Sequence, residues 1–327
     1  MPLHRVCPDR PGGSGRHPAT RRHGRVTLPA FEYREPETLE EAIELLREGG
    51  DEARVIGGGT ALVVMLRARL IRSRLLVGLG GISGLGDIQI DGQVDRQVDG
   101  ELDGPVDGGL RIGALATHRE IERSREVRRV APLLGEACGR VGSPTIRNMG
   151  TLGGNLAYGE AASDPAPALL ALDARVTVRG PAGERTVPLA GFFHDFYETA
   201  LGPAEILTAV HVPSSPAPAR STFVKYTCLS EEERAVVSVA AVVLPGPDGT
   251  WTEARIGLGG VAPTPIRARG AEAVLGGGRP TDGRLREAAA AAAADVDPLD
   301  DRQGSAEYRR AMTEVWVRRA LETLRDG

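Results

Sequence analysis

Apolar residues recur at helical spacing from Leu39 to Leu46. Thr38 and Glu41 have the spacing of a capping box, and two glycines follow the apolar pattern. The pattern therefore predicts an amphipathic helix near the beginning of the chain, with ordered structure starting at about Phe31.

A strand, a glycine-rich turn, a helix and a second strand are predicted next. The strands are Arg54–Ile56 and Leu75–Leu79, and the turn Gly57–Gly59 leads into a helix over Ala61–Leu70. Two strands joined through a helix usually lie parallel with a right-handed crossover, so we expect a β–α–β unit here.

The middle of the chain adds a strand, two helices and a hairpin, in that order. The predicted elements are the strand Leu110–Leu115, a helix from a capping box of Thr117 and Glu120 to about Arg125, a helix over about Ala131–Val141, and a hairpin of Ala174–Arg179 and Thr186–Leu189.

From about residue 205 the pattern changes to strands followed by helices. The predicted strands are Ile206–Val212, Thr222–Cys228, Val236–Leu244 and Trp251–Leu258, and the predicted helices are Arg269–Leu275, Asp282–Ala294 and Ser305–Leu324. This succession is typical of an α+β domain packed in two layers. We therefore divide the ordered chain into a first domain over residues 27–204 and a smaller C-terminal α+β domain over residues 205–327.

Two segments fall outside this pattern. Residues 1–26 are rich in Arg, His, Gly and Pro and lack the apolar run of a signal peptide, so we expect a disordered or misassigned N-terminal extension. Residues 91–108 repeat an aliphatic residue followed by Asp every four positions. Because this spacing differs from the nine-residue calcium repeat, we interpret the segment as a low-complexity insert in a surface hairpin and assign it no function.

Composition narrows the function classes. With 41% hydrophobic residues, 4% aromatic residues and a formal net charge of −4, the chain has the material for more than one core and no mark of a nucleic-acid surface. No apolar run has the length of a membrane span. Cys7, Cys138 and Cys228 stand far apart without a CxxC pair, so we expect incidental or buried thiols, compatible with the cytoplasm.

The residue pattern indicates neither a metal-binding site nor a set of residues for acid–base catalysis. The six histidines include no HxxxH or HExxH pair, and we find no nucleophile, base and acid in a triad arrangement. We therefore expect neither a metal site nor a dedicated catalytic residue in this chain.

The first glycine-rich segment, Gly57-Gly58-Gly59-Thr60, lies between a predicted strand and helix. Glycines let backbone amides approach an anion closely, and a helix N-terminus favours negative charge. The segment is neither a P-loop nor GxGxxG. A pyrophosphate cradle and a tight packing turn both fit it.

The second segment, Asn148–Leu156, is expected to be another glycine-rich loop, and Asp164-Pro165 follows it. Two glycine-rich segments and a later carboxylate suit a dinucleotide, because amides hold phosphate and a carboxylate accepts hydrogen bonds from ribose hydroxyls. Asp164 also has the position of an N-cap for a helix starting at Pro165, and both roles can coexist.

These segments, in this order, resemble the FAD-binding medium subunit of the xanthine dehydrogenase/carbon monoxide dehydrogenase family, the molybdenum hydroxylases. The resemblance rests on RVIGGGTALVVMLR, GLRIGALATHREIE, NMGTLGGNLAYGEAASDPAPALLALDA, ILTAVHVP and FVKYTCLSEEERAVVSVAAVV, and covers roughly residues 29–325. It implies an α+β chain in which a two-subdomain FAD-binding domain of the PCMH (vanillyl-alcohol-oxidase-like) type precedes the C-terminal domain.

The resemblance also implies a cofactor site. The pyrophosphate would lie against Ile56, Gly57, Gly58, Gly59, Thr60 and Ala61, with Thr117 nearby. The flavin and its phosphates would be lined by Thr151, Gly154, Asn155 and Tyr158, the ribose end by Asp164, and the flavin from the second domain by Leu207, Lys225 and Glu232.

The chain departs from the family pattern in two places. Many members have His-Ala-Asp where this chain has Tyr158-Gly159-Glu160, and most have a polar residue at Ala61. Some members insert a cysteine-rich loop with an extra iron–sulfur cluster, which this chain cannot hold because it has no cysteine between residues 8 and 137.

The function implied by the resemblance is electron transfer. Electrons would pass from a molybdenum-binding large subunit through a 2Fe-2S small subunit to FAD in this chain and on to an external acceptor, in a heterotrimer. The molybdenum cofactor and the clusters would belong to the partners alone. A stand-alone FAD-dependent oxidoreductase and a scaffold that has lost FAD are the alternatives.

Overall fold

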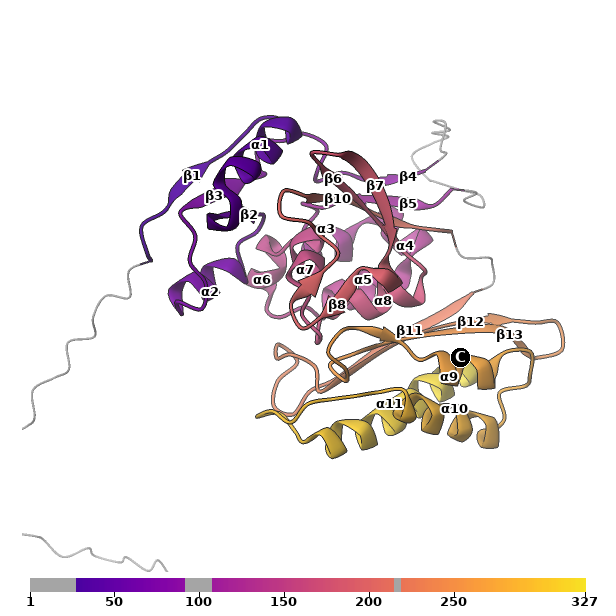
Figure 1. The fold of residues 1–327 in the computed structure, drawn as a ribbon. Coiled ribbons are helices and arrows are strands. Elements are labelled where there is room, and N and C mark those ends of the chain that lie inside the picture. The colour runs from indigo at the N-terminus through magenta and orange to yellow at the C-terminus, as the bar shows by residue number, and fades with distance from the viewer. Residues whose placement is uncertain (1–27, 92–107, 215–218) are drawn as a thin grey trace, which may run out of the picture.

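A computed structural model describes residues 28–91, 108–214 and 219–327 (Figure 1). The predicted N-terminal extension and all but the two end residues of the Asp-rich insert lie outside the described residues. The strands on either side of the insert, β4 (Ile88–Ile90) and β5 (Leu110–Gly113), pair antiparallel, and Asp91 N donates to Gly109 O at 2.7 Å.

The first unit is a small parallel sheet. Its strand order is β1 (Glu32–Arg34), β3 (Leu75–Gly78), β2 (Ala53–Ile56), and both pairings are parallel, as expected for β2 and β3. Helix α1 (Leu39–Gly49) buries its apolar face beside this sheet, and the Thr38 hydroxyl accepts from Glu41 N at 3.2 Å. A short 3-10 turn, η1 (Gly50–Glu52), follows α1. Helix α2 (Leu62–Arg67) is shorter than predicted and ends before Arg69, whose φ is +58°.

The second unit is a five-stranded sheet covered by helices. The strand order is β4, β5, β10 (Ile206–Val212), β6 (Arg175–Gly180), β7 (Gly183–Pro188), and every pairing is antiparallel. The helices are α3 (His118–Arg123), α4 (Arg125–Val130), α5 (Pro132–Gly139), α6 (Pro144–Met149), α7 (Leu152–Tyr158) and α8 (Pro165–Ala171). A 3-10 turn η2 (Leu189–Gly191) and a hairpin of β8 (Phe193–Asp195) and β9 (Glu198–Thr199) complete the unit.

The predicted boundary at residue 204 is wrong. Strand β10 was assigned to the C-terminal domain, but it lies at the centre of this second sheet, between β5 and β6. Its residues are almost all buried, so removing β10 would split the sheet and expose its core. The hydrophobic pattern identified the strand correctly and could not show its partners, because strand pairing here joins residues far apart in the sequence.

The third unit is the expected two-layer α+β domain. Strands β11 (Arg220–Tyr226), β12 (Val237–Pro245), β13 (Trp251–Gly259) and β14 (Ile266–Arg267) form an antiparallel sheet. Figure 1 shows α9 (Arg269–Leu275), α10 (Asp282–Ala294) and α11 (Ala306–Asp326) on one face of this sheet. The opposite face packs on α8, so closely that a Cβ on Gly257 would lie 2.0 Å from Pro167 O.

Candidate functional site

The two glycine-rich segments lie against each other. A Cβ on Gly58 would lie 1.6 Å from Met149 O, and a Cβ on Gly57 would lie 3.0 Å from Thr151 Oγ1. Gly59 has φ +69°, which a glycine adopts without strain. The packing-turn interpretation therefore holds for Gly57 and Gly58, whose missing side chains let the two segments touch.

The first segment is also suited to bind an anion. In the described part of the chain, the backbone amides of Gly58, Gly59 and Thr60 donate to no other protein group. Buried or half-buried amides normally have partners, so these donors are available to a ligand. The two interpretations left open by the sequence are compatible with each other.

The second segment is mostly helical, which corrects the expectation of a loop. Helix α6 ends at Met149, and α7 begins at Leu152 after only Gly150 and Thr151. The Thr151 hydroxyl caps α7 by accepting from Gly154 N at 3.2 Å. Gly153 and Gly154 therefore lie in the first turn of a helix, where they let it approach strand β5 and the cleft.

A cleft of about 500 Å³ opens where these segments meet the third unit. Thirteen of the fifteen residues expected at the cofactor line it: Ile56, Gly57, Gly58, Gly59, Thr60, Ala61, Thr151, Gly154, Asn155, Tyr158, Asp164, Lys225 and Glu232. The structure thus brings together residues from all three units.

Thr117 and Leu207 do not line the cleft. Thr117 caps α3 in a complete capping box with Glu120 and forms a β-bridge with Thr151, so it stands behind the lining residue. The Leu207 side chain, 4% exposed, packs in the hydrophobic core from β10. We expect neither side chain to contact the cofactor.

A buried ion pair joins the two larger units at the cleft. Lys225 Nζ donates to Asp164 Oδ2 at 2.7 Å and to Arg140 O at 2.8 Å, and the two paired side chains are 3% and 6% exposed. Asp164 Oδ1 is buried without a hydrogen-bond partner. Burial raises the pKa of Asp164 to about 6, although the charge of Lys225 lowers it. Because Asp164 lines the cleft, this oxygen is left as an acceptor for a ligand that can donate hydrogen bonds.

The proposed capping role of Asp164 is wrong. Its side chain makes no capping hydrogen bond to α8, and Ser163 Oγ instead accepts from Ala166 N at 3.3 Å. Ser163 Oγ also donates to Asn155 Oδ1 at 2.6 Å, which ties α7 to the start of α8. Asp164 keeps both oxygens for Lys225 and the cleft because Ser163 supplies the cap.

Sequence reasoning missed His118, which was one of the six histidines to which the residue pattern gave no role. It lines the cleft, is 2% exposed, and its Nδ1 is buried without a partner. Burial, and then the nearby charge of Arg147, lower its pKa to about 4, so the ring is neutral at pH 7. Its approach to Gly150 is a tertiary contact that no local pattern indicates.

The rim of the cleft carries a second polar cluster. Glu160 accepts from Arg234 Nη1 and from the Tyr197 hydroxyl, both at 3.1 Å. The rings of Tyr197 and Tyr158 pack in a tilted arrangement, with centroids 5.0 Å apart and an interplanar angle of 45°. Glu160 stands where the family pattern differs, and here it links α7 to the loop between β11 and β12, on which Arg234 lies.

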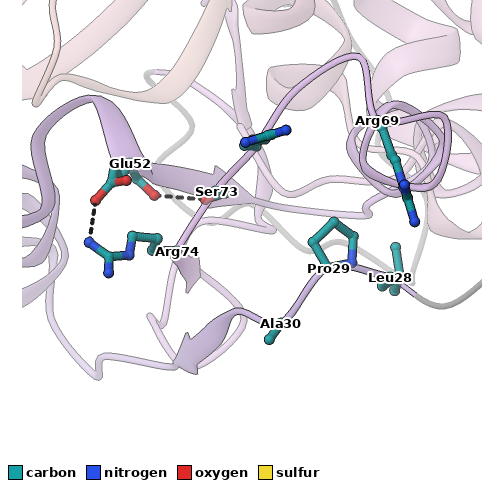
Figure 2. Close-up of a pocket in the computed structure, with 8 residues that line it drawn as sticks. Leu28, Pro29, Ala30, Glu52, Arg69, Ser73 and Arg74 are labelled. Carbon is teal, nitrogen blue, oxygen red and sulfur yellow. Dashed lines mark hydrogen bonds and ion pairs between the residues drawn. The ribbon is translucent and has the colours of Figure 1, made fainter.

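Another cavity, of about 470 Å³, lies away from the glycine segments (Figure 2). Arg74 pairs there with Glu52 at 3.0 Å, and the other lining residues include Leu28, Arg69 and Ser73. None of the expected cofactor residues lines it. The described residues contain no cluster of potential metal ligands, and none of their helices is long and apolar enough to span a membrane.

The chain matches two family models. Residues 29–215 match the FAD binding domain in molybdopterin dehydrogenase, and residues 224–324 match the CO dehydrogenase flavoprotein C-terminal domain. The junction between the two matches falls after β10, in agreement with the sheet topology.

Relatives with known names cover most of the chain. It is 33% identical over 293 residues to the 6-hydroxypseudooxynicotine dehydrogenase complex subunit alpha of Paenarthrobacter nicotinovorans, covering 90% of this chain and 94% of the relative. It is 33% identical over 294 residues to the carbon monoxide dehydrogenase medium chain of Hydrogenophaga pseudoflava, covering 90% and 96%. A solved carbon monoxide dehydrogenase structure from Hydrogenophaga pseudoflava matches with a TM-score of 0.84 and 32% identity, over 91% of this chain and 98% of that one.

Proposed function

The chain belongs to the family of FAD-binding medium subunits of molybdenum hydroxylases, and we propose that it carries electrons from an iron–sulfur partner subunit through FAD to an external acceptor. It is an oxidoreductase subunit whose cofactor is FAD. The relatives are named as chains or subunits of larger enzymes, which supports a subunit over a stand-alone oxidoreductase. A 2Fe-2S small subunit and a molybdenum-binding large subunit are the partners of this proposal, and a cytoplasmic location stays a prediction.

The observation that carries the proposal is the unpartnered Asp164 Oδ1 in a cleft lined by free backbone amides. FAD has hydroxyl donors on its ribose and ribityl chain and a charged pyrophosphate, and these are the complements of a carboxylate oxygen and of amides at a helix N-terminus. The residues present therefore fit the cofactor.

We assign the roles of the lining residues by their chemistry. Gly58, Gly59 and Thr60 would hold the pyrophosphate through their amides, and Asp164 would accept from a hydroxyl of the cofactor. Lys225 would supply positive charge beside the flavin, held in place by Asp164 and Arg140 O. When bound, FAD supplies redox chemistry that accepts electrons singly and releases them in pairs. The chain's own residues bind and orient it, and none has to act as an acid or base.

The first experiment is the absorbance spectrum of the purified chain, followed by identification of the released cofactor. We expect a flavin spectrum and about one FAD per chain, as a single-site cofactor requires. Co-purification with the partner subunits should then yield molybdenum and iron in the complex and none in this chain alone. A colourless chain that takes up no added FAD would overturn the proposal and favour the scaffold alternative.

FAD binding should weaken as the pH falls through about 6, because burial raises the pKa of Asp164 to that value. The free chain then gains a proton on a carboxylate that has to accept from the cofactor, so linkage predicts a dissociation constant about tenfold higher at pH 5 than at pH 7. Flavin fluorescence titrations measure this. Asp164→Asn should bind FAD more weakly and should show no such pH dependence. If that variant shows the same pH dependence as the wild type, a group other than Asp164 causes it.

A further inference from the structure

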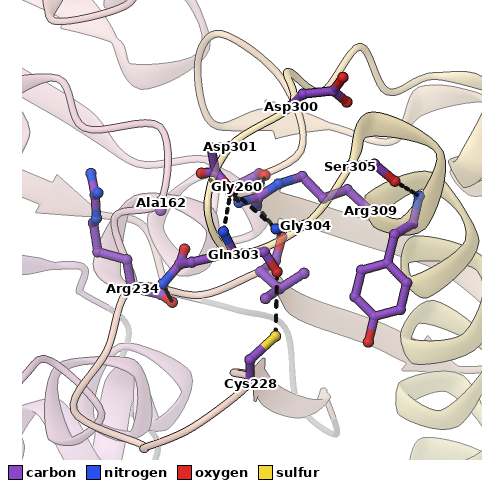
Figure 3. Close-up of polar contacts among 12 residues, drawn as sticks. Ala162, Cys228, Arg234, Gly260, Asp300, Asp301, Gln303, Gly304, Ser305 and Arg309 are labelled. Carbon is purple, nitrogen blue, oxygen red and sulfur yellow. Dashed lines mark hydrogen bonds and ion pairs between the residues drawn. The ribbon is translucent and has the colours of Figure 1, made fainter.

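We infer that Arg309 of helix α11 is a positioning residue for the FAD cleft: it fixes two cleft walls at once without lining the cleft itself. The inference rests on the proposed function only in taking the cleft as the FAD site. Arg309 is buried, 4% exposed, and Figure 3 shows its side chain reaching from α11 toward Asp301 and Gly260.

The guanidinium of Arg309 donates four hydrogen bonds. Nη1 donates to Val236 O and to Gly260 O, both at 2.8 Å. Nη2 donates to Asp301 Oδ1 and Oδ2, both at 2.7 Å. A buried charge with this many partners orders the backbone segments that supply them, because any movement leaves a buried donor unsatisfied.

The bond from Arg309 to Gly260 O reaches the wall formed by α7, α8 and the turn between them. Gly260 N donates to Ala161 O at 2.8 Å, so Gly260 joins Arg309 to the turn between the two helices. Glu160, Ala162 and Ser163 of the same turn line the cleft. Arg309 is thus two hydrogen bonds away from this wall.

The other bonds reach the wall formed by the loop between β11 and β12. Val236 N closes the base of this loop by donating to Tyr226 O at 2.8 Å, and its carbonyl binds Arg309. Asp301 Oδ1 accepts from Gln303 N at 2.8 Å, and Gln303 Nε2 donates to Arg234 O at 3.1 Å (Figure 3). Arg234 lines the cleft and binds Glu160, so the two walls are joined to each other and to Arg309.

Lysine cannot replace this arginine. Its ammonium group is a single point with three donors, whereas Arg309 binds two carbonyls with one nitrogen and a carboxylate with the other. If one wall of the cleft becomes less ordered, a smaller fraction of the molecules has a cleft that can bind FAD. The apparent dissociation constant for FAD then rises in inverse proportion to that fraction.

The test compares FAD dissociation constants of Arg309→Lys, Gln303→Ala and wild-type apoprotein, measured by fluorescence titration, with thermal unfolding and visible circular dichroism of the bound flavin. Gln303→Ala removes the side-chain bond to Arg234 O at a half-buried position and leaves the backbone bond of Gln303 N to Asp301 in place. The matched control is Arg284→Lys, since Arg284 likewise binds two carbonyls, Val274 O at 2.6 Å and Gly276 O at 3.0 Å, in the same domain and away from the cleft.

We expect Arg309→Lys to raise the FAD dissociation constant about tenfold and Gln303→Ala about threefold, on the assumption that the competent fraction falls by those factors. The flavin dichroism should change in both, and Arg284→Lys should lower the unfolding temperature while leaving FAD affinity unchanged. The inference fails if Gln303→Ala and Arg309→Lys bind FAD like the wild type, or if Arg284→Lys weakens binding as much as Arg309→Lys. If Arg309→Lys does not fold, Gln303→Ala decides alone. A wild-type chain that binds no FAD would instead overturn the proposed function.

Discussion

Asp164→Ala should purify without FAD and should lower the free energy of unfolding by about 3–5 kcal/mol, the cost of breaking a buried ion pair. Lys225 would lose its ion-pair partner at a site where its side chain is 3% exposed and only Arg140 O remains as an acceptor. The cleft would also lose the carboxylate oxygen that we assign to a hydroxyl of the cofactor. Urea unfolding of the apoprotein and the flavin absorbance of the purified chain measure the two effects.

The double variant Asp164→Ala with Lys225→Met separates the two effects. Because it removes both buried charges, it should recover much of the lost stability, since apolar replacements of a buried pair are often neutral. It should not recover FAD. If the single variant keeps full FAD occupancy, the assignment of Asp164 to the cofactor is wrong; if the double variant is no more stable than the single one, the unpaired lysine is not the cause of the loss.

Gly58→Val should abolish FAD binding and destabilise the apoprotein by about 1–3 kcal/mol or more, the usual cost of overpacking. The sequence alone attributes such an effect to a blocked approach of the cofactor. The structure shows a second cause that acts on the protein before FAD binds. Even a Cβ at this position would lie 1.6 Å from Met149 O, which is a backbone atom and cannot rotate away as a side chain could. The two glycine-rich segments would have to separate before any cofactor arrives.

Gly191→Ala is the control, because a Cβ there meets nothing within 4 Å and the residue has no positive φ. It should leave both the unfolding temperature and FAD binding unchanged. If the Gly58→Val apoprotein is as stable as the wild type and fails only to bind FAD, the cause of the loss is instead that the valine side chain blocks the approach of the cofactor.

The local elements were predictable because their signals are local. The capping boxes, the spacing of apolar residues and the glycine stops place α1, α9 and α10 within a residue of their observed bounds. The glycine segments and Asp164 were also recognisable as a group, since the residue types and their order are specific. The errors concern partners: β10 was given to the wrong domain, α6 and α7 were taken for a loop, and Asp164 was given a cap that Ser163 supplies.

By itself, the sequence determined most of the local elements and the α+β class of the C-terminal domain, because helices, strands and turns depend on nearby residue types. Its resemblance to a known family then supplied the cofactor and most of the residues around the cleft. Only the tertiary structure decided that Asp164 binds Lys225, that His118 is buried in the cleft, and that Arg309 ties its walls together. Those pairs are separated by tens of residues or more, and their energies come from burial and from hydrogen bonds across units, which no local pattern of side chains records.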